Sequence, residues 1–317
     1  MIVCFDIGGT TVKGAVAHAV DNIRPFPRRP TPASDFAAFV AALKSVMAEA
    51  GGTPQCVAIS IAGIVDPETQ RAVVANVPCI NGRRLQADLE DALGMSVLIA
   101  NDADCCVLAE AGIGAGRGHR IVFGVILGTG VGGGLVIDGK LINSHGGFAG
   151  EWGHGPVAAT RAGHPPVELP RFACGCGQIG CVDAVCSARG MEKLHVELSG
   201  QSLSSEQITQ AWIAGDSAAA RTIDVYLDIL SGPLALVANV TGATIIPVGG
   251  GLSNCGPLIG ALDEAVRSRI LRRINRPLVV QALCQVEPGL VGAAVLGFAS
   301  LEQSTSGGRG NGASANR

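Results

Sequence analysis

Short apolar runs alternate with helical spacing of apolar residues along the first third of the chain. Two apolar runs flank a Gly-Gly-Thr turn within residues 2–20, which predicts a β-hairpin. Helical spacing follows over 35–52 and stops at a Gly pair. A continuous apolar run at 56–65 indicates a buried strand. The pattern also predicts a helix at 85–94, a strand at 96–100 and a helix from about 102.

The second part of the chain opens in the same way as the first. Residues 120–142 predict a strand, a Gly-rich turn and a second strand. The elements predicted after it are helices near 184–198, 204–214, 218–240, 257–273 and 289–301, and strands at 243–248 and 277–283. Alternating strands and helices indicate an α/β protein. The two similar openings suggest a duplicated fold.

This duplication predicts two domains. We expect an N-terminal lobe over 1–117, completed by the last helix at 289–301, and a C-terminal lobe over 118–288. The final segment, 304–317, is rich in Gly, Ser and Asn and is expected to be a disordered tail.

Composition narrows the class of protein. The chain has 317 residues, of which 48% are hydrophobic and 15% charged, and this excludes a mostly disordered protein. A net charge of −3 gives no electrostatic footprint for nucleic acid. The N-terminus lacks the pattern of a signal peptide, and no apolar run predicts a membrane span, so we expect a cytoplasmic protein with no membrane partner. Its 11 cysteines are then expected as thiols or metal ligands more than as disulfides.

Glycine-rich segments are the first candidates for chemistry. "LGTGVGGG" has the dinucleotide-fingerprint spacing at Gly128, Gly130 and Gly133, but a strand follows it where the fingerprint needs a helix. "GLVIDGKL" nearly spells a P-loop, yet Leu141 stands where that loop needs Ser or Thr. We reject both interpretations.

Two matching turns remain, "DIGGTTVK" at 6–13 and "LGTGVGG" at 127–133. Each offers consecutive backbone N–H groups and a hydroxyl group, which together suit phosphate oxygens. Lys13 adds a positive charge, and Asp6 could hold Mg²⁺ through oxygen ligands. The alternative is that both segments are ordinary hairpin turns. The occurrence of two matching turns disfavours this alternative. The predicted phosphate-binding residues are Asp6, Gly8, Gly9, Thr10, Thr11, Lys13, Gly128, Thr129 and Gly130.

Carboxylates and a histidine could serve a transfer reaction. "ANDAD" places Asn101, Asp102 and Asp104 after a predicted strand, where α/β proteins bind ligands. Alternatively, Asn101 or Asp102 caps the next helix. "GEWGH" carries Glu151 and His154, three apart and thus on one face if helical, although a surface Glu and a core His would read the same.

A thiol cluster lies in "FACGCGQIGCVD". Cys174, Cys176 and Cys181 form a C-x-C-x4-C pattern that lacks one ligand for tetrahedral zinc. A redox pair is disfavoured because no C-x-x-C precedes a helix here. Spacing alone does not select the fourth ligand among His145, His154, His164 and Cys186.

Taken in order, the motifs resemble those of the ROK family (repressors, open reading frames and sugar kinases) over about residues 3–300. The resemblance rests on "DIGGTTVKGAV", "ANDADCCVLAE", "LGTGVGGGLV", "GEWGH", "CGCGQIGC" and "VGGGLSN". Within the family, "ANVPCINGRRLQADLE" and "GEWGHGPV" are most similar to bacterial N-acetyl-D-glucosamine kinases.

The resemblance implies an actin-like fold of two ribonuclease-H-like lobes, with ATP in the cleft between them. It implies Asp102 as catalytic base and Asn101, Glu151 and His154 as sugar contacts. Asp183 stands where most members carry a sugar-binding Glu. Gly249, Gly250 and Gly251 resemble the segment that lines the adenosine pocket, although they could equally form a helix-entry turn. His154 becomes the fourth ligand of a structural zinc site with Cys174, Cys176 and Cys181.

The resemblance therefore implies transfer of phosphate from ATP, with Mg²⁺, to the 6-hydroxyl of N-acetyl-D-glucosamine, by a homodimer. Kinases of N-acetylmannosamine, glucose or fructose carry the same motifs and stay open. A sugar-sensing regulator is disfavoured, because a helix-turn-helix would precede the first strand and the net charge is negative. An actin-like filament subunit would not account for Asp102, Glu151 and the thiol cluster together.

Overall fold

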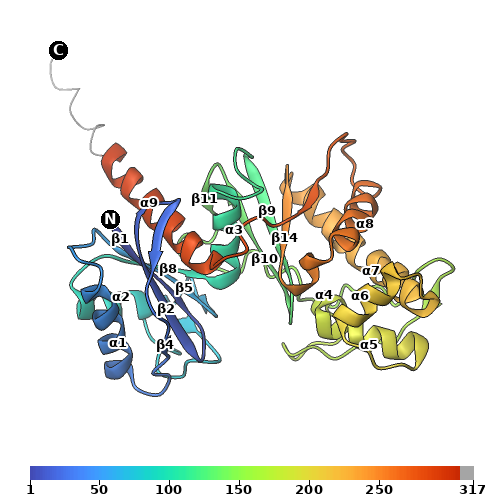
Figure 1. The fold of residues 1–317 in the computed structure, drawn as a ribbon, viewed down its shortest axis with the longest axis horizontal. Helices are drawn as coiled ribbons and strands as arrows, with labels where there is room; N and C mark the ends of the chain where they lie inside the picture. The colour runs from blue at the N-terminus through green and yellow to red at the C-terminus, as the bar shows by residue number, and fades with distance from the viewer. Residues whose placement is uncertain (308–317) are drawn as a thin grey trace, which may run out of the picture. The chain divides into compact units, whose positions relative to one another are not determined.

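The computed structural model describes residues 1–307, and contacts among residues divide the chain into two units (Figure 1). Of the described residues, unit 1 comprises 1–113, 143–148 and 286–307, and unit 2 comprises 114–142 and 149–285. No pattern in the sequence marks 143–148 as part of unit 1. We describe each unit by itself.

The sheet of unit 1 has the strand order β3-β2-β1-β5-β8, and β4 also pairs with β2. β1 and β2 form the predicted antiparallel hairpin, whereas β5 and β8 continue the sheet parallel to β1. The carboxyl ends of β1, β5 and β8 therefore meet at one edge. The strands are β1 (Ile2–Ile7), β2 (Thr11–Ala19), β3 (Asn22–Pro25), β4 (Arg29–Pro30), β5 (Val57–Ile61) and β8 (Val97–Asn101), and a separate pair is β6 (Ile64–Val65) and β7 (Ala72–Val73).

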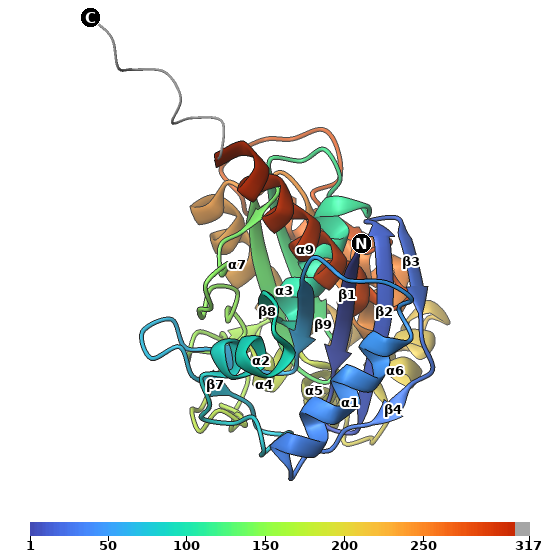
Figure 2. The same cartoon turned by 90° about the vertical axis from the view of Figure 1, so that its left-hand side faces the viewer.

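Helices cover both faces of this sheet because side chains alternate along each strand. Val3 and Phe5 of β1 pack with one apolar cluster, which includes residues of α1 and α2, whereas Ile2 and Cys4 pack with Leu290 of α9. Figure 2 shows α1 and α2 next to each other within unit 1. The helices of unit 1 are α1 (Phe36–Ala48), α2 (Leu85–Leu93), α3 (Asp102–Gly112) and α9 (Pro288–Gly307).

Glycines let α9 approach its neighbours closely. A Cβ atom at Gly292 would lie 1.9 Å from the backbone oxygen of Cys105 in α3, and one at Gly297 would lie 2.4 Å from Ile2 Cδ1. No larger residue fits at Gly292 unless α9 and α3 separate. The last helix thus belongs to the core of unit 1.

Unit 2 repeats the sheet of unit 1. Its strand order is β11-β10-β9-β14-β15, with an antiparallel hairpin, β9–β10, followed by two parallel neighbours. The equal order and directions confirm the duplication that the sequence suggested. The strands are β9 (Ile121–Leu127), β10 (Val131–Ile137), β11 (Lys140–Leu141), β14 (Ile246–Gly249) and β15 (Val279–Gln281), and a separate hairpin is β12 (Arg161–Ala162) with β13 (Val167–Glu168).

The helices of unit 2 share one large apolar core with its sheet. Tyr226 and Leu230 of α7 are fully buried there, as is Leu262 of α8. The helices are α4 (Val182–Cys186), α5 (Ala188–Ser199), α6 (Ser205–Ile213), α7 (Ser217–Thr241) and α8 (Gly256–Arg267), with a 3-10 turn η1 (Gly251–Asn254).

α7 is long and apolar enough to cross a membrane by length and composition, and 50% of its most apolar window is buried inside the protein. Helices in the core of soluble proteins pass the same test. Because Tyr226 and Leu230 lie in the core of unit 2, we read α7 as a core helix.

Several predicted elements differ from the structure in their bounds. The strand predicted at 56–65 is β5 and β6, separated at Gly63, where a Cβ atom would lie 2.6 Å from Val73 O. The helix predicted near 184–198 is α4 and α5, because Ser187 caps α5. The helix predicted at 257–273 ends at Arg267. The final helix continues to Gly307, so the predicted start of the tail at residue 304 lies inside this helix. The rest of the predicted tail, 308–317, lies outside the described residues.

Candidate active site

The first predicted phosphate turn is the β1–β2 hairpin loop of unit 1. Gly8 N–H donates to Thr11 O at 3.0 Å, and the Thr31 hydroxyl donates to Gly8 O at 2.7 Å. A Cβ atom at Gly9 would lie 2.7 Å from Asn76 Cβ, so the segment around Asn76 requires glycine there. The loop is therefore held in one conformation beside the carboxyl end of β1.

A row of alternating charges lies behind this turn. Lys13 Nζ is 2.9 Å from Asp6 Oδ2 and 2.8 Å from Glu287 Oε2. The row is extended at one end by Ser60, which donates to Asp6 Oδ1 at 3.1 Å, and at the other by Arg28, which donates to Glu287 Oε1 at 2.5 Å. Burial would raise the pKa of Glu287, yet the cations of Lys13 and Arg28 hold that pKa below its usual value. Sequence reasoning missed Glu287, since no motif contains it.

The predicted catalytic residue stands where β8 meets α3. Asn101 is the N-cap of α3, and its side-chain oxygen accepts from the N–H groups of Ala103 and Asp104 at 2.8 and 3.4 Å. Its amide also donates to Gly63 O at 2.8 Å. The capping alternative thus holds for Asn101. Asp102 is not the cap, and its side chain is exposed.

The phosphate turn and Asp102 lie at the same edge of the unit 1 sheet. Ile7 pairs with Ile61 of β5, and Ile61 pairs with Asn101 of β8. Adjacent strands are about 4.8 Å apart, so the end of β8 lies about 10 Å from the end of β1. Carboxyl ends of parallel strands are where α/β sheets bind ligands.

Asn143, which no sequence motif contains, supports the start of α3. Asn143 Nδ2 donates to Asp104 Oδ2 at 3.0 Å, and both side chains are buried. Asn143 belongs to the short 143–148 segment of unit 1. Asp104, which shares the "ANDAD" motif with Asp102, therefore joins that segment to α3.

The second predicted phosphate turn is the β9–β10 loop of unit 2. Gly128 N–H donates to Gly130 O at 3.0 Å, and Val131 N–H donates to Asp183 Oδ1 at 2.7 Å. A Cβ atom at Gly130 would lie 2.9 Å from the same Asp183 oxygen. Cys174 Sγ is 3.5 Å from Asp183 Oδ2. Asp183 thus links the turn to the thiol loop through its two oxygens.

This turn also borders a cavity of about 570 Å³ within unit 2. Gly128 and Thr129 line it together with Gly251, so the adenosine-type segment and the phosphate turn share one hollow. Gly250 has φ +87°, and a Cβ atom there would lie 2.4 Å from Leu127 O, so only glycine fits. Polar residues of α6, which carry no motif and were missed, form another wall: Ser205, Glu206, Thr209 and Gln210.

Glu151 and His154 lie in a turn of unit 2, so the helical face considered for them was wrong. His154 N–H donates to Glu151 O at 3.1 Å, and His154 Nε2 is 4.0 Å from Glu151 Oε2. Trp152 anchors the turn by donating to Gly132 O at 2.9 Å. A Cβ atom at Gly153 would lie 2.2 Å from Val131 O, so the turn lies directly against β10.

The three cysteines and His154 form one cluster. One ligand atom from each residue lies within 4.8 Å of the other three. His154 Nδ1 is 3.6 Å from Cys174 Sγ, and Cys176 Sγ is 3.7 Å from Cys181 Sγ. Burial raises the pKa of Cys174 to about 12, whereas a hydrogen bond from the backbone N–H of Gln178 lowers the pKa of Cys176 to about 7. A Cys₃His set is a zinc ligand set, so these residues fit that metal.

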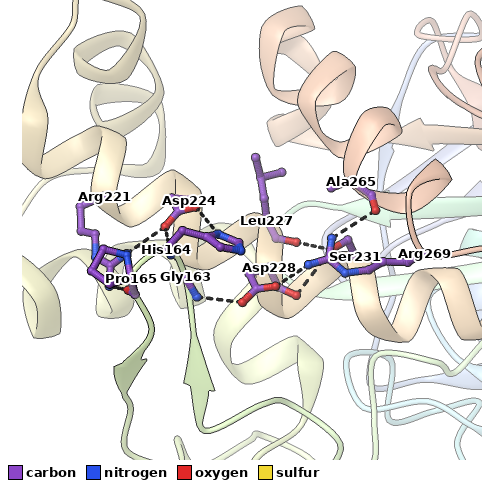
Figure 3. Close-up of polar contacts among 10 residues, drawn as sticks. All are labelled: Gly163, His164, Pro165, Arg221, Asp224, Leu227, Asp228, Ser231, Ala265 and Arg269. Atoms are coloured by element: carbon purple, nitrogen blue, oxygen red, sulfur yellow. Dashed lines mark hydrogen bonds and ion pairs between the residues drawn. The ribbon is translucent and has the colours of Figure 1, made fainter.

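The two other histidines and the cysteine considered as fourth ligands have different surroundings. His164 binds Asp224 of α7 through its backbone N–H at 2.6 Å and its Nδ1 at 3.0 Å (Figure 3). Cys186 is fully buried in α4. His145 belongs to unit 1 and does not take part in the cluster.

Comparison with known proteins agrees with this geometry. A model of the ROK family matches residues 2–299. The chain is 36% identical over 295 residues to N-acetylgalactosamine kinase AgaK of Shewanella sp. (strain ANA-3), covering 92% of this chain and 95% of that protein. It is 35% identical to N-acetyl-D-glucosamine kinase of Pectobacterium atrosepticum, covering 92% and 97%.

A solved structure supports the fold. The ROK hexokinase of Thermus thermophilus has a TM-score of 0.80 and 25% identity, and the match covers 95% of this chain and 99% of that one. Together with the two matching sheets, this likeness confirms the predicted actin-like α/β fold.

Proposed function

Since this chain belongs to the ROK family, we propose that it is an ATP-dependent kinase of N-acetylhexosamines, with N-acetyl-D-glucosamine as substrate and its 6-hydroxyl as acceptor. The observation that carries the proposal is the shared edge of the unit 1 sheet, where an exposed Asp102 stands about 10 Å from a phosphate-type turn. A base for the alcohol and a binding loop for the phosphates are the two parts that phosphoryl transfer needs.

In this proposal Asp102 accepts the proton of the sugar hydroxyl. Its exposed side chain is accessible to a substrate, and Asn101 fixes the start of α3 while it contacts the sugar. Glu151 and His154 contribute further sugar contacts, because both are half-exposed and adjacent. The roles of these residues follow the family resemblance.

Within unit 1, the β1–β2 turn and Lys13 are the phosphate-binding residues of this proposal. Within unit 2, the β9–β10 turn binds phosphate, and the cavity at Gly251 receives the adenosine part. Its volume suits a small ligand. Mg²⁺, when bound with ATP, would neutralise phosphate charge, and Asp6 is an oxygen ligand of the kind it prefers.

A structural zinc is the second part of the proposal. Cys174, Cys176, Cys181 and His154 would hold it, with Nδ1 of His154 toward the thiols and Nε2 toward Glu151. Zinc would fasten the loop and fix the orientation of the imidazole ring beside the sugar contacts.

N-acetyl-D-galactosamine is the second candidate substrate. The relative with 36% identity is named for that sugar, and Asp183 of this chain is engaged with Val131 N–H. A carboxylate one methylene shorter than the usual Glu reaches less far toward a sugar. The preference between N-acetylglucosamine and N-acetylgalactosamine can therefore depend on the residue at position 183.

The test is ADP release by the purified protein with N-acetylglucosamine, N-acetylgalactosamine, N-acetylmannosamine, glucose and fructose. We expect the highest kcat/KM with N-acetylglucosamine, and NMR of the product should show phosphate on the 6-oxygen. ADP release with none of these sugars would contradict the kinase function. A preference for a different sugar, or phosphate at another position, would contradict only the finer assignment.

A further inference from the structure

Glu287 is the residue at the phosphate turn that no motif accounts for. Its Oε2 and Asp6 Oδ2 lie on either side of the Lys13 ammonium, at 2.8 and 2.9 Å. The side chains of Lys13, Asp6 and Glu287 are 28%, 20% and 23% exposed, so solvent screens these ion pairs only in part.

The backbone around Glu287 is specialised for this contact. Glu287 has φ +47°, a left-handed conformation that residues other than glycine rarely adopt. Two residues later, a Cβ atom at Gly289 would lie 2.6 Å from Asp6 Cγ, so only glycine lets the start of α9 come so close to Asp6. A strained residue beside a required glycine points to a functional constraint.

The arrangement of charges explains why a second carboxylate is useful. Lys carries a compact charge on a flexible side chain, so a single partner leaves its position loosely defined. Asp6 lies opposite Lys13 in the β1–β2 register and holds the ammonium from one side. Glu287 holds it from the other side, and Arg28 offsets the charge of Glu287 at 2.5 Å. The row thus fixes Lys13 without making the turn more negative.

We propose that Glu287 is a positioning residue that holds the Lys13 ammonium at the hairpin turn for the phosphates of the nucleotide. The inference rests on the proposed function, because it assigns Lys13 to nucleotide binding. Glu287 itself does not touch the reacting atoms.

The first test is Glu287→Gln in the full chain, which keeps the side-chain volume and removes the charge. Loss of one charge-assisted contact predicts a KM for ATP raised about 5- to 30-fold. The KM for the sugar should stay within about twofold, since only the nucleotide side is affected. Glu49→Gln is the matched control, because Glu49 is also an Arg-paired carboxylate of unit 1 but lies at the end of α1. It should leave both KM values unchanged.

The second test is a double-mutant cycle with Lys13→Met, read by calorimetric titration with ADP. If Glu287 acts through Lys13, Glu287→Gln weakens ADP binding in the wild-type background and has no further effect beside Lys13→Met. Equal losses in both backgrounds, or an unchanged KM for ATP and unchanged ADP affinity in Glu287→Gln, would overturn the inference. Because ADP binding needs no sugar, the cycle tests the role of Glu287 even if no sugar in the assay is phosphorylated. Absence of sugar phosphorylation would contradict the kinase function alone.

Discussion

Asp102 occupies the first position of α3, one residue after the cap that Asn101 supplies. Because Asn101 already satisfies the first amides of the helix, Asp102→Asn should leave the fold intact. Removal of the base should lower kcat about 10²- to 10⁴-fold. The measurement is steady-state ADP release beside a thermal melt, with Asp91→Asn on α2 as a control. Near-normal turnover in a folded Asp102→Asn protein would exclude Asp102 as the base.

Asp224 anchors the loop before the thiol cluster to α7 (Figure 3). Burial would raise the pKa of Asp224, but hydrogen bonds from His164 and the charge of Arg221 hold that pKa below its usual value. The stabilisation is therefore present above the ordinary carboxyl value of about 4 and disappears as the pH falls through the lowered pKa.

The melting temperature of the wild type should exceed that of Asp224→Asn at pH 7, and the difference should shrink below about pH 4. Thermal melts of both proteins between pH 7 and pH 3 provide the measurement. A difference that stays constant over this range would mean that the ionised carboxylate of Asp224 contributes nothing to the anchor.

At the scale of elements, the contact between α9 and α3 depends on Gly292. Gly292→Ala places a Cβ atom against the Cys105 backbone, so we expect a loss of about 1–3 kcal/mol in the free energy of unfolding. Gly260→Ala in α8, where a Cβ meets nothing within 4 Å, should instead stabilise by about 0.5–1 kcal/mol. Denaturant unfolding of both variants is the measurement. Equal changes in the free energy of unfolding would mean that α9 moves away from α3 at no cost.

The thiol loop gives a second prediction at this scale. The purified protein should contain about one zinc per chain, and Cys176→Ser should lose most of it because three ligands hold zinc poorly. Cys79→Ser, outside the cluster, should keep the metal. Elemental analysis of the three proteins is the measurement. A fully active wild type without zinc would contradict the site.

The hydrophobic pattern predicted most elements because each depends on nearby residues. It could not predict the break between α4 and α5, where a Cβ at Gly190 would meet the Val185 backbone at 2.4 Å, since that contact exists only after the chain has turned. The β12–β13 hairpin was missed because each strand has only two residues.

For the candidate site too, the sequence predicted the residues that lie in local motifs and missed those that depend on distant contacts. Motifs pointed to Lys13, Asn101 and the thiols, all of which lie in short recognisable segments. Glu287 and Asn143 were missed because they reach Lys13 and Asp104 from distant parts of the sequence. The α6 wall of the cavity was missed because its polar residues look like any solvent-facing helix surface.

For the whole molecule, the family resemblance predicts a homodimer. Light scattering after size-exclusion chromatography should give about twice the chain mass of 32.0 kDa. A mass of one chain at assay concentration would contradict this. The charge of −3 is small, so weak repulsion between copies should not prevent association.

The place of α9 in unit 1 has a consequence for biosynthesis. Ile2, Cys4 and Ala58 lie in one apolar cluster with Leu290, Ala293 and Ala294, which are translated more than 200 residues later. On the ribosome, one apolar face of the N-terminal sheet therefore stays uncovered until α9 has emerged. A nascent chain stalled before Val286 would therefore expose this apolar surface to chaperones, and truncation there should yield insoluble protein.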